Sequence, residues 1–571
     1  MALTTTPPAA PARERPAPSR SRPGSWGTDD PVVTRSRAPR RILPGVVVAL
    51  SAAAVACYLA VALARIGSPA ELEWMEGGVS MHVQRVLDGH SVYGPPSIGF
   101  TPYLYTPLFY YVGAAFRAVL GSGLWPLRLV SLVSSIALMT AVARLAWTET
   151  RSRWAAVASA GVLAACFSAG GAWLDVARVD TLCLALLFWS LAIARTARRW
   201  PVAMAAGALA AAAVMTKQVA ALPALAVLPF LWRRDRRLFG AYAGALVGLG
   251  VAAAAVLQWT SGGWFLFYAV QVPLHHELVP SEYVGFWTAD LWGRLWPAVL
   301  AGLGLASWAL YGRWQRRRKG AAAIRTAGTV TPVDLWFLVP VTGALVLAAY
   351  LSRLHSGGYA NVLLPAYGAA ALLTAVVLHR LDSRIGSAGP GRRAGRRLRL
   401  GAALAAVGTF GVLAYNPASL VPGPGAGAQQ QATVAALRTL PGPVYLPGHP
   451  MYLAEAGLPT VAQTAAVEDV LRAHIGTTAR TLRAQLESLV RGRYFGALVV
   501  DSQSDLTVLP PDVCRYYAPA GTLPGWRRLL PVTGTATAPE TLWLARPAPL
   551  PYEPVGCQSG STGLRLAAAS G

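Results

Sequence analysis

Three acidic residues stand close together in a sequence that has few of them. Glu71, Glu73 and Glu76 fall within six positions directly after an apolar segment, although the 571 residues include only 25 Asp and Glu. Glu73 and Glu76 are three residues apart and would share one face of a helix, which the apolar residues that follow favour. A carboxylate in a partly apolar cleft can accept a proton near neutrality. The pair is a candidate general base, and the alternative is an amphipathic surface helix whose acids face water.

Other ionisable residues fall at the ends of later apolar segments: Asp175, Arg178 and Asp180 in "LDVARVD", Lys217 in "TKQ", and His355 in "LHSGG". An arginine can hold a phosphate through two parallel hydrogen bonds, and a lysine or histidine can add a positive charge or a donor. Each of these residues could instead have a purely structural role. Asp175 and Arg178 could form an ion pair that closes two helix ends, Lys217 could reach toward the lipid headgroups, and His355 could be structural.

The motifs that would indicate a metal or a nucleotide are missing from the sequence. His275, His276 and Glu277 are adjacent, so their side chains point apart and cannot easily share one ion. No HExxH, CxxC or Asp-rich repeat accompanies them, and no GxxxxGK[ST], GxGxxG or GxSxG is present. We therefore expect no cofactor and no metal, because support for a divalent metal is weak.

The composition predicts a membrane protein. Hydrophobic residues make up 54% of the sequence, charged residues 13%, and the mean hydropathy is +0.43. Apolar runs near 20 residues recur, each long enough to cross a bilayer as a helix. The net charge of +25 comes from arginine clusters between these runs, as the positive-inside rule requires, and does not indicate nucleic-acid binding.

The arginine clusters predict an all-α polytopic protein with about 11 transmembrane helices, the N-terminus inside and the C-terminus outside. The Pro- and Tyr-rich stretch at 104–120 is interpreted as an interfacial or re-entrant helix, because only one of the two apolar runs before Arg151 can cross. The charged stretches described above, together with "VPLHHELVPSEY" (272–283), then all face the outer side. The spans are expected near residues 43–65, 127–147, 154–173, 179–195, 201–216, 218–232, 238–259, 291–311, 333–351, 361–379 and 400–416.

Three regions are expected along the chain. Residues 1–41 read as a disordered basic cytoplasmic tail, 42–416 as the transmembrane domain with a first outer loop at 66–103, and 417–571 as a soluble extracytoplasmic α/β domain. In the last region "GPVYLPGHP" and "YFGALVVDS" predict short buried strands with a helix between them. Cys514 and Cys557 are a candidate disulfide if this region is extracytoplasmic.

The order of these motifs resembles bacterial GT-C-type integral-membrane glycosyltransferases, relatives of the protein O-mannosyltransferases and the aminoarabinose transferases. The resemblance spans about residues 43–416 and rests on the first-loop acids, "RVLDGHSVY", "FTPYLYTPLFYY", "ARVDTL", "TKQ" and "LHSGGYANVLLPAY". It implies an enzyme of the bacterial cytoplasmic membrane that moves a sugar from a polyprenyl-phosphate donor to a glycan, lipid or protein acceptor at the outer face. Membrane lipid is a further expected partner.

The resemblance also implies roles for individual residues. Glu76 or Glu73 would be the catalytic base, and Arg178, Lys217 and His355 would contact the donor phosphate. A further set would position the substrates: Asp175, Asp180, Tyr105, Gln218 and Asn361. Many family members carry an Asp-Glu pair where this chain has Glu-Trp-Met-Glu, so the resemblance leaves open which acid acts.

Two other functions compete with this interpretation. A secondary transporter or lipid-carrier flippase would also place charges in the membrane, but it should show inverted repeats and charges near the bilayer midplane. The sequence has no evident repeat, and its unusual charges fall at helix ends. A scaffold without chemistry would tolerate replacement of both Glu73 and Glu76.

Overall fold

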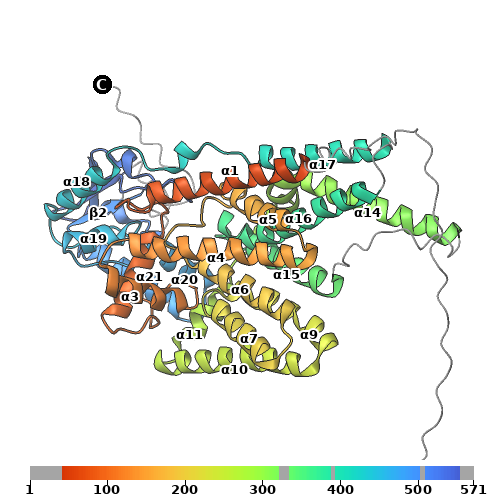
Figure 1. Ribbon diagram of the computed structural model, residues 1–571. Coiled ribbons are helices and arrows are strands. Elements are labelled where there is room, and N and C mark those ends of the chain that lie inside the picture. The colour runs from red at the N-terminus through yellow and green to blue at the C-terminus, as the bar shows by residue number, and fades with distance from the viewer. Residues whose placement is uncertain (1–41, 320–333, 388–392, 502–507, 553, 555–571) are drawn as a thin grey trace, which may run out of the picture. The chain divides into compact units, whose positions relative to one another are not determined.

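The structure, a computed structural model, describes residues 42–319, 334–387, 393–501, 508–552 and 554 (Figure 1). From Ile42 onward the chain forms one compact unit. The expected tail at 1–41 and the predicted disulfide partner Cys557 lie outside the described residues. Cys514 is buried, and its pairing with Cys557 stays a prediction.

The chain is a mostly helical, multi-pass membrane protein. Within the described residues six helices are long and apolar enough to cross a bilayer. They are α1 (Ile42–Arg65), α4 (Trp125–Thr150), α6 (Val179–Thr196), α10 (Arg236–Thr260), α15 (Leu335–Leu354) and α16 (Leu364–Ser387). Shorter apolar helices accompany them: α3 (Leu108–Leu120), α5 (Arg153–Ala165), α7 (Trp200–Val214), α11 (Trp264–Leu266) with α12 (Val272–Leu274), and α17 (Arg393–Val412). The expected number of about 11 crossings stays a prediction.

Several helices differ from their predicted extents. The span predicted at 154–173 is helical only to Ala165; turns follow at 166–172, with positive φ at Gly171 and Ala172. The span predicted at 218–232 is broken into η2 (Gln218–Ala220), α8 (Ala221–Ala226) and α9 (Leu228–Arg234).

The helix expected to carry both Glu73 and Glu76 is α2 (Glu76–Leu87), and it begins at Glu76. Glu73 lies in extended backbone before it and forms a β-bridge with Thr533. The prediction that the two acids share one helical face was therefore wrong.

The remaining elements before the C-terminal part are α13 (Glu282–Gly285), α14 (Gly293–Lys319), the π-helical segments η3 (Phe267–Gln271) and η4 (Phe286–Trp292), and the 3-10 helices η6 (Ala360–Leu363) and η7 (Pro417–Leu420).

The C-terminal part contains a four-stranded sheet, which includes the two buried strands that the sequence predicted, β1 (Val444–Tyr445) and β2 (Ala497–Val500), and two that it did not, β3 (Tyr517–Thr522) and β4 (Thr541–Ala545). Strands β1 and β2 are parallel and fully buried, and β4 joins β2 to β3 by antiparallel pairing. Its helices are α18 (Ala426–Arg438), α19 (Pro450–Ala456), α20 (Thr464–Ala473) and α21 (Thr478–Arg491), with the 3-10 helices η8 (Val513–Arg515) and η9 (Trp526–Leu529). The sequence predicted one helix where α20 and α21 lie; positive φ at His474 and Gly476 separates them.

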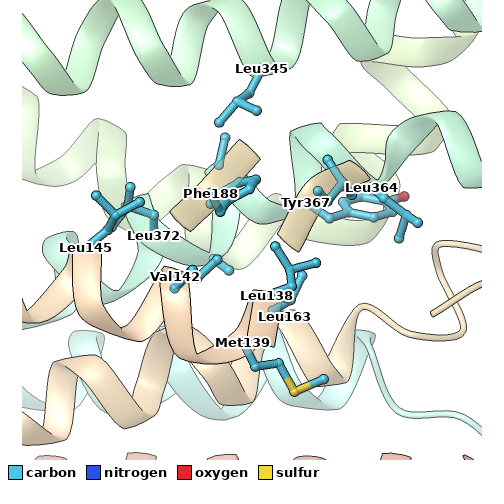
Figure 2. Packing of buried hydrophobic residues seen from close by; sticks show 14 of the residues in the cluster. Leu138, Met139, Val142, Leu145, Leu163, Phe188, Leu345, Leu364, Tyr367 and Leu372 are labelled. Carbon is cyan, nitrogen blue, oxygen red and sulfur yellow. The ribbon is translucent and has the colours of Figure 1, made fainter. Parts of the chain in front are cut away.

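Two apolar clusters hold these elements together. The first joins membrane helices; Figure 2 shows Leu138 and Val142 of α4, Phe188 of α6, Leu345 of α15 and Leu372 of α16 packed closely. The second includes α2, α3 and the C-terminal elements in one continuous core. The loop at 66–103 and the C-terminal part therefore share one apolar core.

Small residues allow helices to approach closely where they cross. Gly161 of α5 lies against Ser51 of α1, so replacing this glycine tests the packing of the two helices. A Cβ on Gly161 would lie 2.2 Å from the Ser51 Cβ and 2.4 Å from its Cα. We predict that Gly161→Ala destabilises the protein by about 1–3 kcal/mol, because the helices must separate. Gly240→Ala in α10 is the matched control, since nothing lies within 4 Å of its Cβ position. Thermal unfolding in detergent checks this, and equal melting temperatures for the two variants would contradict it.

Candidate active site

Segments far apart in the sequence meet at one cavity of about 440 Å³, a size typical of ligand sites. All five stretches that the sequence placed on one side of the membrane contribute to its lining. Of the predicted site residues, those that line it are Glu73, Tyr105, Arg178, Lys217, Gln218, His355 and Asn361. Glu76, Asp175 and Asp180 lie outside its lining.

Glu73 is the first-loop acid that borders the cavity. Its side chain is fully buried, and Arg178 donates from Nη1 to both carboxylate oxygens at 2.9 and 3.1 Å. The backbone N–H of Met75 donates to Oε2 at 3.1 Å. Burial raises the pKa of Glu73 to about 7, against the opposing effect of Arg178. This carboxyl can therefore exchange a proton near neutrality.

Glu76 occupies a different environment. Arg128 of α4 donates to its two oxygens at 2.9 and 2.6 Å, and the backbone N–H groups of Leu72 and Ala177 donate at 2.7 Å each. Burial acts to raise the pKa of Glu76, but Arg128 and these backbone donors outweigh it and lower the pKa below its usual value. Glu76 stays ionised and fastens α2 to α4 and to the chain before α6.

Asp175 forms an ion pair away from the cavity, but its partner is Arg65 and not Arg178, with which the structural alternative had paired it. Arg65 at the end of α1 donates to its oxygens at 2.7 and 2.5 Å, and also to the carbonyls of Ala172 and Leu420. This pair joins α1 to the segment before α6. Asp175 and Arg178, although three residues apart, serve different partners.

Two cations converge beside Tyr105 in the cavity. Arg178 donates from Nη2 to the Tyr105 hydroxyl at 2.8 Å, and the Arg178 guanidinium and the Lys217 ammonium lie 5.5 and 5.3 Å from the centre of its ring. Lys217 pairs with Asp180 at 2.6 Å, and Asn361 donates to the same Asp180 oxygen at 3.1 Å. Burial acts to lower the pKa of Lys217, but Asp180 raises it, so Lys217 stays protonated.

The remaining predicted residues have simpler roles. Gln218 donates to the carbonyls of Leu104 and Ala269 at 2.6 and 2.8 Å, which ties the Pro/Tyr segment to η3. His355 is partly buried and lines the cavity, and its Nδ1 has no hydrogen-bond partner among the described residues.

Sequence reasoning missed the part of the lining that α20 supplies: Glu468, Asp469 and Arg472. It considered His276 only as a metal ligand, found weak support for that role, and assigned it no other, whereas its Nε2 lies 3.5 Å from the Asp469 Oδ1. Charged residues have the same spacing along a helix that faces water and along one that lines a cavity. The sequence of α20 therefore could not indicate that its charged side chains line the cavity. Among the described residues there is no group of three or more His, Cys, Asp or Glu side chains that could hold a metal ion.

A second buried charge cluster joins the first loop to the C-terminal part. His449 lies between two carboxylates: its Nδ1 contacts Glu71, and its Nε2 lies 3.0 Å from an Asp501 oxygen. All three side chains are about 1% exposed, and the ring of Tyr452 stacks on His449. Burial acts to lower the pKa of His449, but Asp501 and Glu71 hold it well above its usual value. His449 therefore acts as a buried cation that fixes the loop carrying Glu73.

Comparisons with known proteins agree with the predicted family. Residues 104–259, less than half of the chain, match the family described as dolichyl-phosphate-mannose-protein mannosyltransferase. The predicted resemblance to GT-C-type membrane glycosyltransferases is confirmed by this match. No curated protein matches the chain significantly in sequence.

Solved structures also align with the chain, and three of them do so at 14–17% sequence identity and TM-scores of 0.39–0.47. ArnT from Cupriavidus metallidurans aligns in a crystal structure bound to undecaprenyl phosphate with a TM-score of 0.47 and 14% identity, covering 80% of this chain and 96% of that one. Its apo structure aligns with a TM-score of 0.45 and 16% identity, covering 88% and 98%. The arabinosyltransferase EmbB from Mycobacterium smegmatis aligns with a TM-score of 0.39 and 17% identity, covering 73% of this chain and 42% of that one.

The His449 cluster yields a stability prediction with a defined pH dependence. His449→Gln leaves Glu71 and Asp501 buried without their cation, so we predict a loss of about 3–5 kcal/mol in the free energy of unfolding. Because the pKa of His449 is raised in the folded protein, its stabilisation is complete below pH about 6.5 and is lost as pH rises through the raised pKa. The difference in melting temperature between wild type and variant should therefore shrink at alkaline pH.

Thermal unfolding across pH in detergent measures this difference. His90→Gln is the control, because His90 is an exposed histidine in the same first loop. A melting temperature for His449→Gln equal to that of His90→Gln at neutral pH would contradict the assigned role.

Proposed function

We propose that this chain, which matches the dolichyl-phosphate-mannose-protein mannosyltransferase family over residues 104–259, is a membrane glycosyltransferase. In this proposal Glu73 is the catalytic base, and Arg178 and Lys217 hold the phosphate of a polyprenyl-phosphate sugar donor. The observation that carries the proposal is the Glu73–Arg178 pair at the cavity, with Lys217 on the same Tyr105 ring. The family description names a phosphate-linked lipid sugar, which supports this class of donor.

In the proposed transfer step, Glu73 accepts the proton of the acceptor hydroxyl and the polyprenyl phosphate is the leaving group. The acceptor hydroxyl oxygen forms a bond with the anomeric carbon of the donor sugar, and its proton goes to Glu73. The bond from that carbon to the phosphate oxygen breaks, and its electron pair leaves with the polyprenyl phosphate. A pKa of about 7 suits Glu73 to this proton transfer, because a base works best when its pKa lies near the operating pH.

The ion pair couples proton transfer to leaving-group stabilisation. Before reaction the carboxylate of Glu73 balances the charge of Arg178. When Glu73 takes the proton it becomes neutral, and the full positive charge of Arg178 becomes available to the phosphate as negative charge develops there. Lys217 adds a second cation, held by Asp180. Fixed positive charges next to a developing anion are among the strongest contributions to catalysis.

The other predicted residues support this arrangement. Tyr105 orients Arg178 through its hydroxyl, Asn361 shares Asp180 with Lys217, and His355 offers a further donor toward the phosphate. Glu76, buried against Arg128, serves as a positioning residue for the loop. Asp175 and Gln218 position backbone segments around the site.

The apolar side of the cavity fits a polyprenyl chain. Leu222, Ala348, Leu351 and Val362 line it, and the Leu351 side chain of α15 is 47% exposed on the molecule's surface, where lipid would contact it. We place the cavity at the outer face of the cytoplasmic membrane, with the N-terminus inside and the C-terminal part outside. The arginines at 195–199 and 233–237 favour this orientation under the positive-inside rule.

Glu73→Gln tests the base directly. The amide cannot take the proton, so we predict that sugar transfer from polyprenyl-phosphate donors falls by about 10²–10⁴-fold per folded protein. Glu282→Gln is the control, since Glu282 also pairs with an arginine but lies outside the cavity lining. Glu76→Gln should instead lower the melting temperature, because Arg128 loses its buried partner. Wild-type transfer by Glu73→Gln would rule out Glu73 as the base.

The pH dependence of transfer provides a second test. Because Glu73 must be deprotonated to accept a proton, kcat/KM should rise with pH and level off above an apparent pKa of about 7. Steady-state transfer from about pH 5.5 to about 8.5 measures this profile. A rate that does not change across this range would contradict a titrating base at the site.

A further inference from the structure

The wall of the cavity formed by α20 takes no part in the transfer step described above. Glu468, Asp469 and Arg472 of this helix line the same cavity as Glu73. Arg472 donates to Glu468 at 2.6 Å, which leaves the wall with one further carboxyl, that of Asp469, whose side chain is 21% exposed. The helix belongs to the C-terminal part, so this part supplies side chains to the site.

His276 adds a buried polar group at the same wall. Its side chain is only 7% exposed, it lines the cavity, and its Nε2 has no hydrogen-bond partner within the described part of the chain. Asp469 lies 3.5 Å away, too far for a direct hydrogen bond of normal length. Burial lowers the pKa of His276, so the ring is neutral and can donate to or accept from a hydroxyl. A buried polar atom without a partner indicates a place where a ligand group completes the hydrogen bonding.

An aromatic surface borders these polar groups. Tyr359 lines the cavity and is 38% exposed, whereas the rings that support it are buried. Trp74 meets it edge-on at 5.8 Å between ring centres, and the Trp173 ring lies 6.5 Å away with its plane inclined by 29°. A rigid exposed ring beside hydrogen-bonding side chains fits a ligand that has one apolar face and many hydroxyls.

We propose that Asp469, His276 and Tyr359 form the subsite for the acceptor, and that the acceptor presents an uncharged sugar there. A pyranose or furanose ring stacks its C–H face on Tyr359 and donates hydroxyl hydrogens to Asp469 and His276. Arg472 pairs with Glu468, and burial raises the pKa of Asp469 to about 7, so this wall carries little net charge and fits an uncharged ligand. The inference rests on the proposed function, because it takes the Glu73 side of the cavity as the reaction centre and makes the α20 side specific for a glycan acceptor.

Two separate binding measurements on the full-length protein in lipid nanodiscs test the proposal. The first titrates a panel of neutral di- and trisaccharides of mannose, glucose, galactose and arabinose and follows tryptophan fluorescence. The second titrates undecaprenyl phosphate. We expect at least one oligosaccharide to bind, and its Kd to rise about tenfold or more in Asp469→Asn and in Tyr359→Ala. Glu487→Gln, which changes an acid on the neighbouring helix α21 outside the cavity lining, should bind as wild type.

The two titrations distinguish a failure of the acceptor-subsite proposal from a failure of the proposed donor. Undecaprenyl phosphate should bind the α20 and Tyr359 variants as it binds wild type and should bind Arg178→Gln more weakly. Oligosaccharide binding that depends on Asp469 without any binding of undecaprenyl phosphate would support the acceptor subsite and contradict the proposed donor. The subsite is overturned if no oligosaccharide of the panel binds, or if Asp469→Asn and Tyr359→Ala both bind the oligosaccharide as wild type does.

Discussion

A charge buried away from water must lie beside an opposite charge, and this constraint organises the region around the cavity. Each of the three buried acids at 71–76 has its own buried cation: Glu71 contacts His449, Glu73 contacts Arg178, and Glu76 contacts Arg128. Asp175 and Arg65 add a fourth pair between α1 and the chain before α6. Because these partners come from α1, α4, the start of α6 and the C-terminal part, the ion pairs fix the positions of all four around one loop.

The three first-loop acids show how the partner decides the chemistry of a carboxyl group. Glu76 receives four hydrogen bonds from Arg128 and the backbone, which keep it ionised. Glu73 receives fewer, and burial raises its pKa to about 7. Glu71 contacts His449, which also contacts Asp501. Of the three, only Glu73 combines a pKa near neutrality with a place in the cavity lining, which is the basis of its proposed role as the base, whereas Glu71 and Glu76 join segments of the fold.

The C-terminal part is integrated with the site. It shares an apolar core with α2 and α3, it holds the first loop through His449, and its helix α20 lines the cavity. Figure 1 shows its strands and helices gathered near α3 at one end of the membrane helices. A change in the C-terminal part can therefore alter the geometry at Glu73 without touching any membrane helix.

The membrane class, the long apolar helices, the two buried strands and the set of charged stretches that meet at the cavity could all be predicted from the sequence alone, because hydropathy and charge are local properties of the chain. The sequence could not decide between Glu73 and Glu76. That difference depends on which arginine, distant in sequence, reaches each carboxylate, and on α2 starting three residues later than the apolar pattern suggested. The contribution of α20 was equally hidden, because Glu468 and Asp469 look like a solvated helix face until the tertiary structure places them beside His276.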